Sequence, residues 1–266
     1  MSTIEIDGFL CDEAEEFRPK IIAAHKELFE LYKDLNRCMM KFLGQQKLGE
    51  NIDAKTVGLT LFCRIIESTQ AVHMLLERGL MPQAKTLTRA ILESYFILAS
   101  LQKKPELLQC YFDQHEDGRK NALKSACQFK GKLLIADAKK HGIEKLYIEQ
   151  KDALAGKELR VLKPIGWAVE ADMEDFYKLH YVAYSNATHS NLSSLDDHWD
   201  VDGDTISLAF GPSDRGLYDC LQCCIVVAAN ATSITATAND VDISADLDIF
   251  KARLAAVEAK YQEVSK

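Results

Sequence analysis

Residues that break regular structure are scarce in this sequence, which has 5 prolines and 13 glycines among 266 residues. This scarcity, together with an aromatic content of only 8%, weighs against a turn-rich β-sandwich and excludes a collagen-like repeat. The sequence also has fewer basic than acidic residues, 32 against 40, and its formal net charge is −8. A protein that coats nucleic acid usually carries the opposite balance. What remains, with 47% hydrophobic and 27% charged residues, is the composition of an ordinary globular protein.

A secretion signal is absent from the start of the sequence, where residues 1–7 have neither a basic start nor an apolar stretch. We therefore expect a cytoplasmic protein whose eight cysteines are reduced, most of them as small buried residues. The group Cys220-x-x-Cys223-Cys224 leaves zinc binding as an alternative. Tetrahedral zinc needs four ligands, however, and no second Cys/His pair stands at finger-like spacing, so we predict neither a metal site nor a cofactor.

Apolar residues recur at helical spacing along most of the chain, which predicts a succession of helices. Prolines at the predicted starts suit first-turn positions, and Gly79 is a natural stop signal. The segment 156–171 contains Pro164 and Gly166 and is expected to be irregular. The predicted helices span residues 19–42, 54–78, 82–103, 105–141, 143–155, 173–188, 217–238 and 245–264.

The most apolar of these runs, residues 217–238, has the length of a membrane span. Asp219, Gln222 and Asn230 interrupt it, so we predict a central core helix and no membrane partner.

Residues 197–210 break the helical pattern, because Asp202-Gly203 stands as a tight turn between two short extended pieces. The alternative of a calcium loop fails, since Thr205 and Gly211 occupy the places where that loop needs Gly and Glu. The sequence therefore predicts an all-α multi-helix bundle with a small β-hairpin. We expect one domain over residues 1–266, with residues 1–53 as an N-terminal helix and loop and residues 211–266 as C-terminal core helices.

Arg89 and Glu93 are the first candidate site residues. They stand four apart on the predicted helix 82–103 and are therefore neighbours on one face. Their largely apolar surroundings favour a partly buried ion pair, and an ion pair on a solvated face is the alternative.

The predicted helix 173–188 and the residues after it carry the second polar group. Tyr181, Ser185 and His189 are spaced by four and share a face, with Tyr177 and Thr188 near that stripe. Such a concentration of hydroxyl, amide and imidazole groups is unusual in an apolar bundle helix.

The same helix supplies the predicted binding residues Tyr184, Ser185 and Asn186. His189, near the helix end, has two interpretations. It acts as an acid or base, because the ordinary pKa of imidazole lies near ~6.5, or it is only a partner of the helix dipole.

These motifs, with the hairpin that follows them, resemble a family of bacterial helical proteins catalogued only as a domain of unknown function. That family in turn resembles the higher-eukaryote-and-prokaryote nucleotide-binding (HEPN) superfamily of helical bundles. The resemblance covers residues 54–210 and is carried by Arg89, Glu93, Tyr184, Ser185 and His189.

The superfamily includes metal-independent RNases of toxin–antitoxin and phage-defence systems, and inactive binding or antitoxin-like modules. Its RNases carry an Arg, often followed by a polar residue, then four to six further residues and a His, whereas residues 185–188 before His189 contain no Arg. The resemblance therefore implies that Arg89 supplies the cation from the neighbouring helix. Arg18 and His25 fit the spacing formally, at the start of another helix, and we interpret that match as coincidence.

The first hypothesis is an HEPN-like effector, an RNase-type toxin of defence or stress response, with RNA or a nucleotide-like ligand as its partner. In it His189 is the base or acid, Arg89 contacts the phosphate and Glu93 orients Arg89. The second hypothesis is a non-catalytic helical module that binds a ligand or a protein. A homodimer is expected under both.

Overall fold

The computed structural model describes residues 3–128, 137–188 and 192–264. Within these ranges the secondary structure is helical apart from one two-stranded antiparallel hairpin. The predicted all-α bundle with a small β-hairpin is therefore confirmed.

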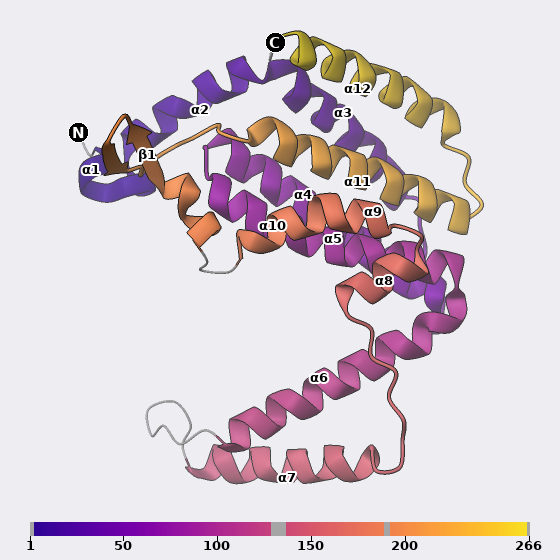
Figure 1. The fold of residues 1–266 in the computed structure, drawn as a ribbon. Coiled ribbons are helices and arrows are strands. Elements are labelled where there is room, and N and C mark those ends of the chain that lie inside the picture. The colour runs from indigo at the N-terminus through magenta and orange to yellow at the C-terminus, as the bar shows by residue number, and fades with distance from the viewer. Residues whose placement is uncertain (1–2, 129–136, 189–191, 265–266) are drawn as a thin grey trace.

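Four long helices form the centre of the bundle. Helices α4 (Ala54–Glu77) and α5 (Met81–Lys103) pack along their lengths as an antiparallel pair, α11 (Leu217–Ala238) lies against both, and α3 (Lys26–Leu43) packs on α11 (Figure 1). In the described part of the chain α11 alone is long and apolar enough to cross a membrane. Of its most apolar window 67% is buried in the protein, which identifies it as a core helix of the bundle.

Further helices flank this centre on two sides. Helix α2 (Asp12–Ala24) leads into α3, and α12 (Ser244–Val264) packs against α3 (Figure 1). On the other side α8 (Pro164–Glu170) and α10 (Val182–Asn186) pack on α5, with α9 (Glu174–Phe176) between them in the sequence. A π-helix, η3 (Tyr177–Tyr181), joins α9 to α10 without a break.

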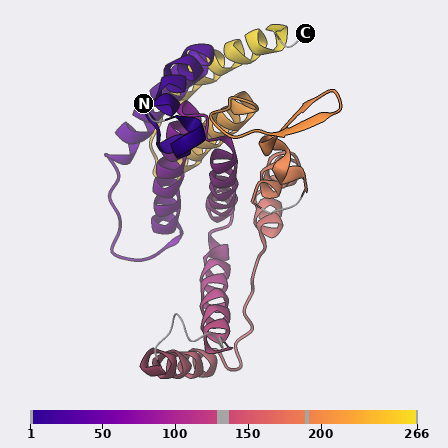
Figure 2. The ribbon, with the colours of Figure 1, turned by 90° about the vertical axis from the view of Figure 1, so that its left-hand side faces the viewer.

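Helices α6 (Leu108–Gln128) and α7 (Asp137–Ala153) form an arm that extends away from the bundle (Figures 1 and 2). The 3₁₀ turn η2 (Pro105–Leu107) leads into it from α5. The two helices pack on each other, and the amide of Gln150 donates to Glu116.

The prediction of one helix over residues 19–42 is wrong, because the chain forms α2 and α3 with a break at His25. His25 has φ −116° and ψ 28°, outside the helical range. Helix α2 begins at Asp12, since the Cys11 Sγ accepts a hydrogen bond from the Ala14 amide at 3.4 Å. Pro19 consequently lies inside α2 and not in a first turn.

Three further predicted boundaries differ from the structure. Helix α7 continues through residues 141–143, where a helix end was expected. The segment expected to be irregular contains α8, whose Pro164 takes the first helical position. The helix expected over 173–188 is interrupted by the π-helix.

The hairpin matches its prediction. Strands β1 (Trp199–Asp202) and β2 (Thr205–Leu208) pair in register, and Gly203 adopts φ +56° in the turn between them. The 3₁₀ helix η4 (Leu192–His198) precedes it. At its base Phe210 contacts Phe9 of the N-terminal segment, which consists of α1 (Ile4–Asp7) and η1 (Gly8–Leu10), with 5.7 Å between the ring centres.

Candidate functional site

Arg89 and Glu93 lie on the face of α5 that meets η3 and α10. One turn apart, they form an ion pair with 3.2 Å between Arg89 Nη2 and Glu93 Oε1. Their side chains are 26% and 38% exposed, so the pair sits at the edge of the bundle and is reached by solvent.

Tyr181, the last residue of the π-helix η3, bridges this ion pair. Its hydroxyl accepts a hydrogen bond from Arg89 Nε at 3.1 Å and donates one to Glu93 Oε1 at 2.7 Å. The guanidinium carbon lies 5.3 Å from the centre of the Tyr181 ring, and Tyr177 stacks on that ring at 4.7 Å. Single π-helical turns are frequent at functional sites, because they place side chains where a regular helix does not.

Thr188 completes the arrangement. Arg89 Nη1 donates to Thr188 Oγ1 at 2.5 Å, and that hydroxyl donates to the Ser185 carbonyl at 2.8 Å. Arg89, Glu93, Tyr181 and Thr188, which we name the Arg89 cluster, thus join α5 to the end of α10.

The surroundings keep the Tyr181 phenol neutral and the Arg89 guanidinium charged at neutral pH. Burial, followed by the hydrogen bond to Glu93, raises the pKa of the Tyr181 phenol to about 12. Burial opposes the charge on Arg89, but Tyr181 and Glu93 outweigh it, so the pKa of the guanidinium is raised. The cluster therefore contains a neutral phenol next to a permanent cation.

A pocket of about 520 Å³ lies beside the cluster, between α5, α10 and the start of α11. Lys85, one turn before Arg89, reaches into its wall and donates to both carboxylate oxygens of Asp197, at 2.7 and 2.6 Å. We name it the Lys85 pocket. Its lining residues are Lys85, Ala183, Tyr184, Asn186, Ala187, Asp196, Asp197, Arg215, Gly216 and Asp219.

Of the predicted binding residues, two lie at the Lys85 pocket and one contacts the Arg89 cluster. Tyr184 and Asn186 line the Lys85 pocket, whereas Ser185 presents its carbonyl to Thr188. Tyr184 is buried, which raises the pKa of its phenol. His189 lies outside the described residues.

The three neighbouring cysteines of α11 are buried in the core. Thr88 Oγ1 lies 3.3 Å from Cys220 Sγ and 3.5 Å from Cys224 Sγ. Within residues 3–128, 137–188 and 192–264, no group of three or more His, Cys, Asp or Glu side chains is arranged to hold a metal ion.

Tyr181 and Thr188 are the partners of Arg89 that the predicted site set did not include. Both were placed on or near the polar stripe, and their spacing of seven residues, two helical turns, is the signal that puts them on one face.

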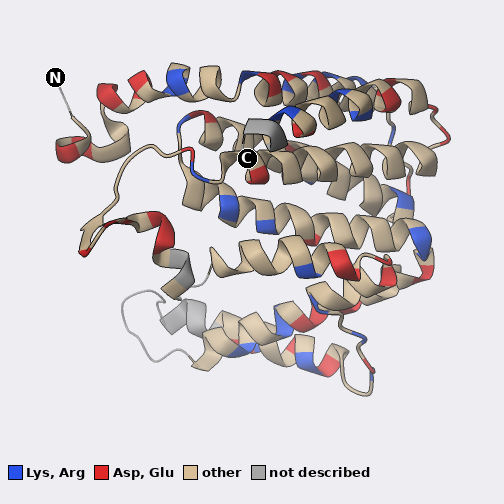
Figure 3. Cartoon of the chain, turned by 45° about the horizontal axis from the view of Figure 1, so that its top comes forward, with Lys and Arg blue, Asp and Glu red and all other residues tan. Residues whose placement is uncertain are grey.

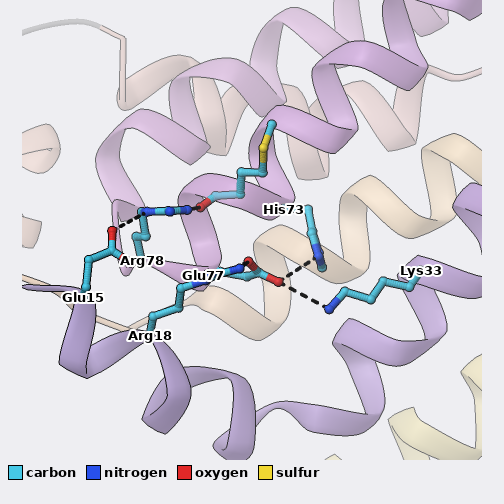
Figure 4. A network of polar contacts seen from close by, with 7 residues as sticks. Glu15, Arg18, Lys33, His73, Glu77 and Arg78 are labelled. Atoms are coloured by element: carbon cyan, nitrogen blue, oxygen red, sulfur yellow. Dashed lines mark hydrogen bonds and ion pairs between the residues drawn. The ribbon is translucent and has the colours of Figure 1, made fainter.

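A second polar network, centred on the buried Glu77 of α4, has no counterpart among the predicted site residues (Figure 4). Arg18 donates to Glu77 Oε2 at 3.1 and 2.5 Å, and Glu77 Oε1 lies 3.1 Å from His73 Nε2 and 3.4 Å from Lys33 Nζ. The His73 ring stacks on Tyr32 at 4.8 Å. His73 and Glu77 stand four apart in an apolar helix, which is the one signal of this pair in the sequence.

The sequence model of a family of unknown function, DUF5677, matches residues 55–206 of the chain. The matched range contains the whole Arg89 cluster, Lys85 and Asp197. Neither the comparison with curated proteins nor that with solved structures found a match.

Proposed function

The chain belongs to the family of unknown function DUF5677, and we propose that it is a cytoplasmic, HEPN-like effector that cleaves RNA without a metal ion at the Arg89 cluster. One observation carries the proposal. Arg89, a partly exposed cation, is hydrogen-bonded to Thr188, the residue directly before His189 in the sequence. A phosphate-binding group and the residue next to a titratable imidazole are thus joined across two helices.

Arg89 retains the capacity to bind a phosphate. A guanidinium has five N–H groups, and the contacts to Tyr181, Thr188 and Glu93 use one on each nitrogen. Two N–H groups therefore have no partner among the described residues. They are available to phosphate oxygens, for which the planar guanidinium is well suited.

Glu93 and Tyr181 act through Arg89 as positioning residues. The carboxylate holds Nη2 and the phenol holds Nε, so the guanidinium plane is fixed before substrate arrives. A cation that is already oriented stabilises charge in a transition state better than a mobile one, because it needs no reorganisation.

The reaction would be an internal transesterification. The RNA 2′-oxygen forms a bond to phosphorus while the bond from phosphorus to the 5′-oxygen breaks, which leaves a 2′,3′-cyclic phosphate and a 5′-hydroxyl. One proton leaves the 2′-hydroxyl and one joins the departing 5′-oxygen. We assign one of these proton transfers to His189 and the stabilisation of phosphoryl charge to Arg89.

The charge around the site limits how RNA could bind. Lys85 and Arg215 line the neighbouring pocket together with Asp196, Asp197 and Asp219, so cations are not in excess there. With a net charge of −8 on the whole chain, binding would rest on a few contacts, and its salt dependence would be shallow.

The test is RNA cleavage by purified protein in the presence of EDTA. Wild type is expected to produce 2′,3′-cyclic phosphate ends, and Arg89→Ala and His189→Ala to lower the rate by about 10²–10⁴-fold. Tyr181→Phe is expected to lower the rate less, because it loosens the guanidinium without removing it. Circular dichroism verifies that each variant is folded.

Matched controls are Arg253→Ala, an exposed arginine paired with Asp34, and His115→Ala, an exposed histidine on α6. Both should cleave within twofold of wild type. Intact RNA with wild type, or unchanged cleavage by Arg89→Ala and His189→Ala, refutes the proposal. Expression in cells extends the test, since an RNase-type toxin arrests growth and both site variants should relieve that arrest.

A non-catalytic binding module is the second candidate, and the Lys85 pocket favours it. The pocket offers about 520 Å³ and a mixture of cations, carboxylates, an amide and a phenol, which suits a small polar ligand. In this case Arg89→Ala lowers the melting temperature, because it removes two hydrogen bonds and an ion pair, and there is no cleavage to lose.

A further inference from the structure

The β-hairpin has one apolar and one polar face. Facing residues of an antiparallel pair lie on the same side, and successive residues alternate sides. The register pairs Trp199 with Leu208 and Val201 with Ile206, so one face carries four apolar side chains. We name these four residues the hairpin face.

The opposite face is polar and acidic. Asp200 pairs with Ser207 and Asp202 with Thr205, and Asp204 stands in the turn. Acidic side chains gather on the hairpin and on η4 before it (Figure 3).

The described part of the chain leaves three of the four residues of the hairpin face open to solvent. Val201 and Ile206 are each 68% exposed and Leu208 is 84% exposed, whereas Trp199 is half-buried. The hairpin protrudes from the bundle (Figure 2) and is held at its base, where the Ala209 amide donates to the His198 carbonyl at 2.8 Å. An isolated two-stranded hairpin is at best marginally stable in water, so an uncovered apolar face on one needs a partner.

We propose that a second copy of this chain covers the hairpin face, so that two hairpins pack face to face in a homodimer. Two antiparallel hairpins related by a two-fold axis present the same apolar side chains to each other, which is the condition for an isologous interface. The acidic faces then point outward to water on opposite sides of the paired hairpins, and the arrangement brings no carboxylates into contact.

The area available fits such a dimer. At the hairpin base Phe210 is 67% exposed and packs on Phe9, and Leu10, next in the chain, is 94% exposed. With the hairpin face included, five of these apolar side chains are at least two-thirds exposed, and each can bury about 100 Å², or roughly 500 Å² per copy. Two copies give about 1,000 Å², the smallest area expected of a specific interface, for which a micromolar Kd is expected.

Charge favours this occupant over an anionic membrane or a nucleic acid. The hairpin carries Asp200, Asp202 and Asp204, and it contains no Lys or Arg between Trp199 and Phe210. A surface rich in phosphate would be repelled by these carboxylates, whereas a second apolar face is not.

The experiment compares two double variants of the same strand β2 in the full chain. Ile206→Asp with Leu208→Asp places two charges on the hairpin face, and the control Thr205→Lys with Ser207→Lys places two charges on the polar face, where they stand opposite Asp202 and Asp200. Sedimentation velocity over a dilution series reports the dimer Kd for each. Wild type and the polar-face variant are expected to dimerise alike, and the hairpin-face variant to be at least tenfold weaker.

Since Asp disfavours strands, a second variant with Ile206→Thr and Leu208→Thr removes the apolar groups while keeping β propensity, and it should also weaken the dimer. The proposal is overturned if wild type is monomeric at about 100 µM, a hundred times a micromolar Kd. Equal weakening by the hairpin-face Asp variant and the polar-face Lys variant overturns it as well. The proposal is also overturned if wild type binds phosphatidylcholine or phosphatidylglycerol vesicles and the hairpin-face variant does not.

Discussion

Replacement of the buried Glu77 by glutamine tests the energetics of the bundle most directly. The substitution keeps the size of the side chain and removes its charge. In the native protein the Glu77 carboxylate is buried and faces Arg18, Lys33 and His73 (Figure 4). An amide at this position would direct its NH₂ group at one of these donors, so at least one hydrogen bond to the former carboxylate is lost.

The loss of unfolding free energy in Glu77→Gln depends on how far the charged partners of Glu77 are shielded from water. Removing one member of a buried ion pair costs about 3–5 kcal/mol when the other charge is left in a dry interior. The Arg18 and Lys33 side chains are 41% and 47% exposed and regain water, which places the expected loss at the low end, about 3 kcal/mol. At about 2–4 °C per kcal/mol for a chain of this size, the melting temperature should fall by roughly 6–12 °C.

Urea unfolding followed by circular dichroism measures this loss. The matched control is Glu15→Gln, because Glu15 forms an exposed ion pair with Arg78 next to the same network, at 3.0 Å. That substitution should cost less than about 1 kcal/mol. A Glu77→Gln variant within 1 kcal/mol of wild type would refute the view that the buried carboxylate organises the junction of α2, α3 and α4.

Two further predictions concern His73 and Gly79. Burial lowers the pKa of His73 below its ordinary value of 6.5, so below that pH the unfolded chain binds a proton that the folded chain does not. Stability should therefore fall between pH 7.5 and 5.5, by up to about 1.4 kcal/mol per pH unit, and His73→Leu should reduce the fall in urea titrations at the two pH values. An undiminished fall in that variant would contradict the assignment. Gly79 has φ +70°, and an added Cβ would lie 2.6 Å from the Ser213 amide nitrogen, whereas Gly156, at φ +76°, has open space around it. Replacing either glycine by alanine costs about 1–2 kcal/mol, because alanine disfavours the left-handed conformation. Gly79→Ala should lower the free energy of unfolding by more than Gly156→Ala does, and the difference between the two measures the clash with the backbone at Ser213. Equal melting temperatures for the two variants would disprove that contact.

The parts of the fold that could be predicted are those in which several local signals agree. Helix α11 has the bounds expected from its apolar run, and α4 begins at Ala54 where Asp53 caps it, with Asp53 Oδ1 accepting from the Thr56 amide at 2.7 Å. The hairpin followed from Asp202-Gly203 between alternating residues. Periodicity, caps and turn residues all point the same way in these segments.

The boundaries that were missed depend on contacts beyond the local sequence. Pro19 was expected to start a helix, yet the cap at Cys11 makes the helix begin at Asp12, seven residues earlier. The break at His25 coincides with a side-chain contact to Asp214, 189 residues away, with 3.3 Å between His25 Nε2 and Asp214 Oδ2. Helix α8 is short, and its Trp167 is held by Gln114 of the arm at 2.9 Å. Such long-range partners cannot be read from a window of neighbouring residues.

The side-chain directions in the candidate site could not be predicted from regular helical spacing either, because the π-helix η3 interrupts the helix that carries Tyr181. In a regular α-helix residues five apart point about 140° away from each other. Here Phe176 and Tyr181, five apart, both lie against Phe96 of α5, with ring centres 6.5 and 6.2 Å from it. The wider turn of η3 therefore keeps α5 in contact with both ends of the segment.

Spacing by four groups Tyr177 with Tyr181 correctly, but it gives no reason to prefer Tyr181 over Tyr184 as the partner of Arg89. The direction of each side chain is determined by the return to regular α-helix after Tyr181. Thr188 then follows two turns later on the α5 side, and Tyr184 faces the cysteines of α11. The Arg89 cluster thus depends on one irregular turn. Whatever chemistry the cluster supports, its geometry should be more sensitive to changes in residues 177–181 than to equally conservative changes elsewhere in α10.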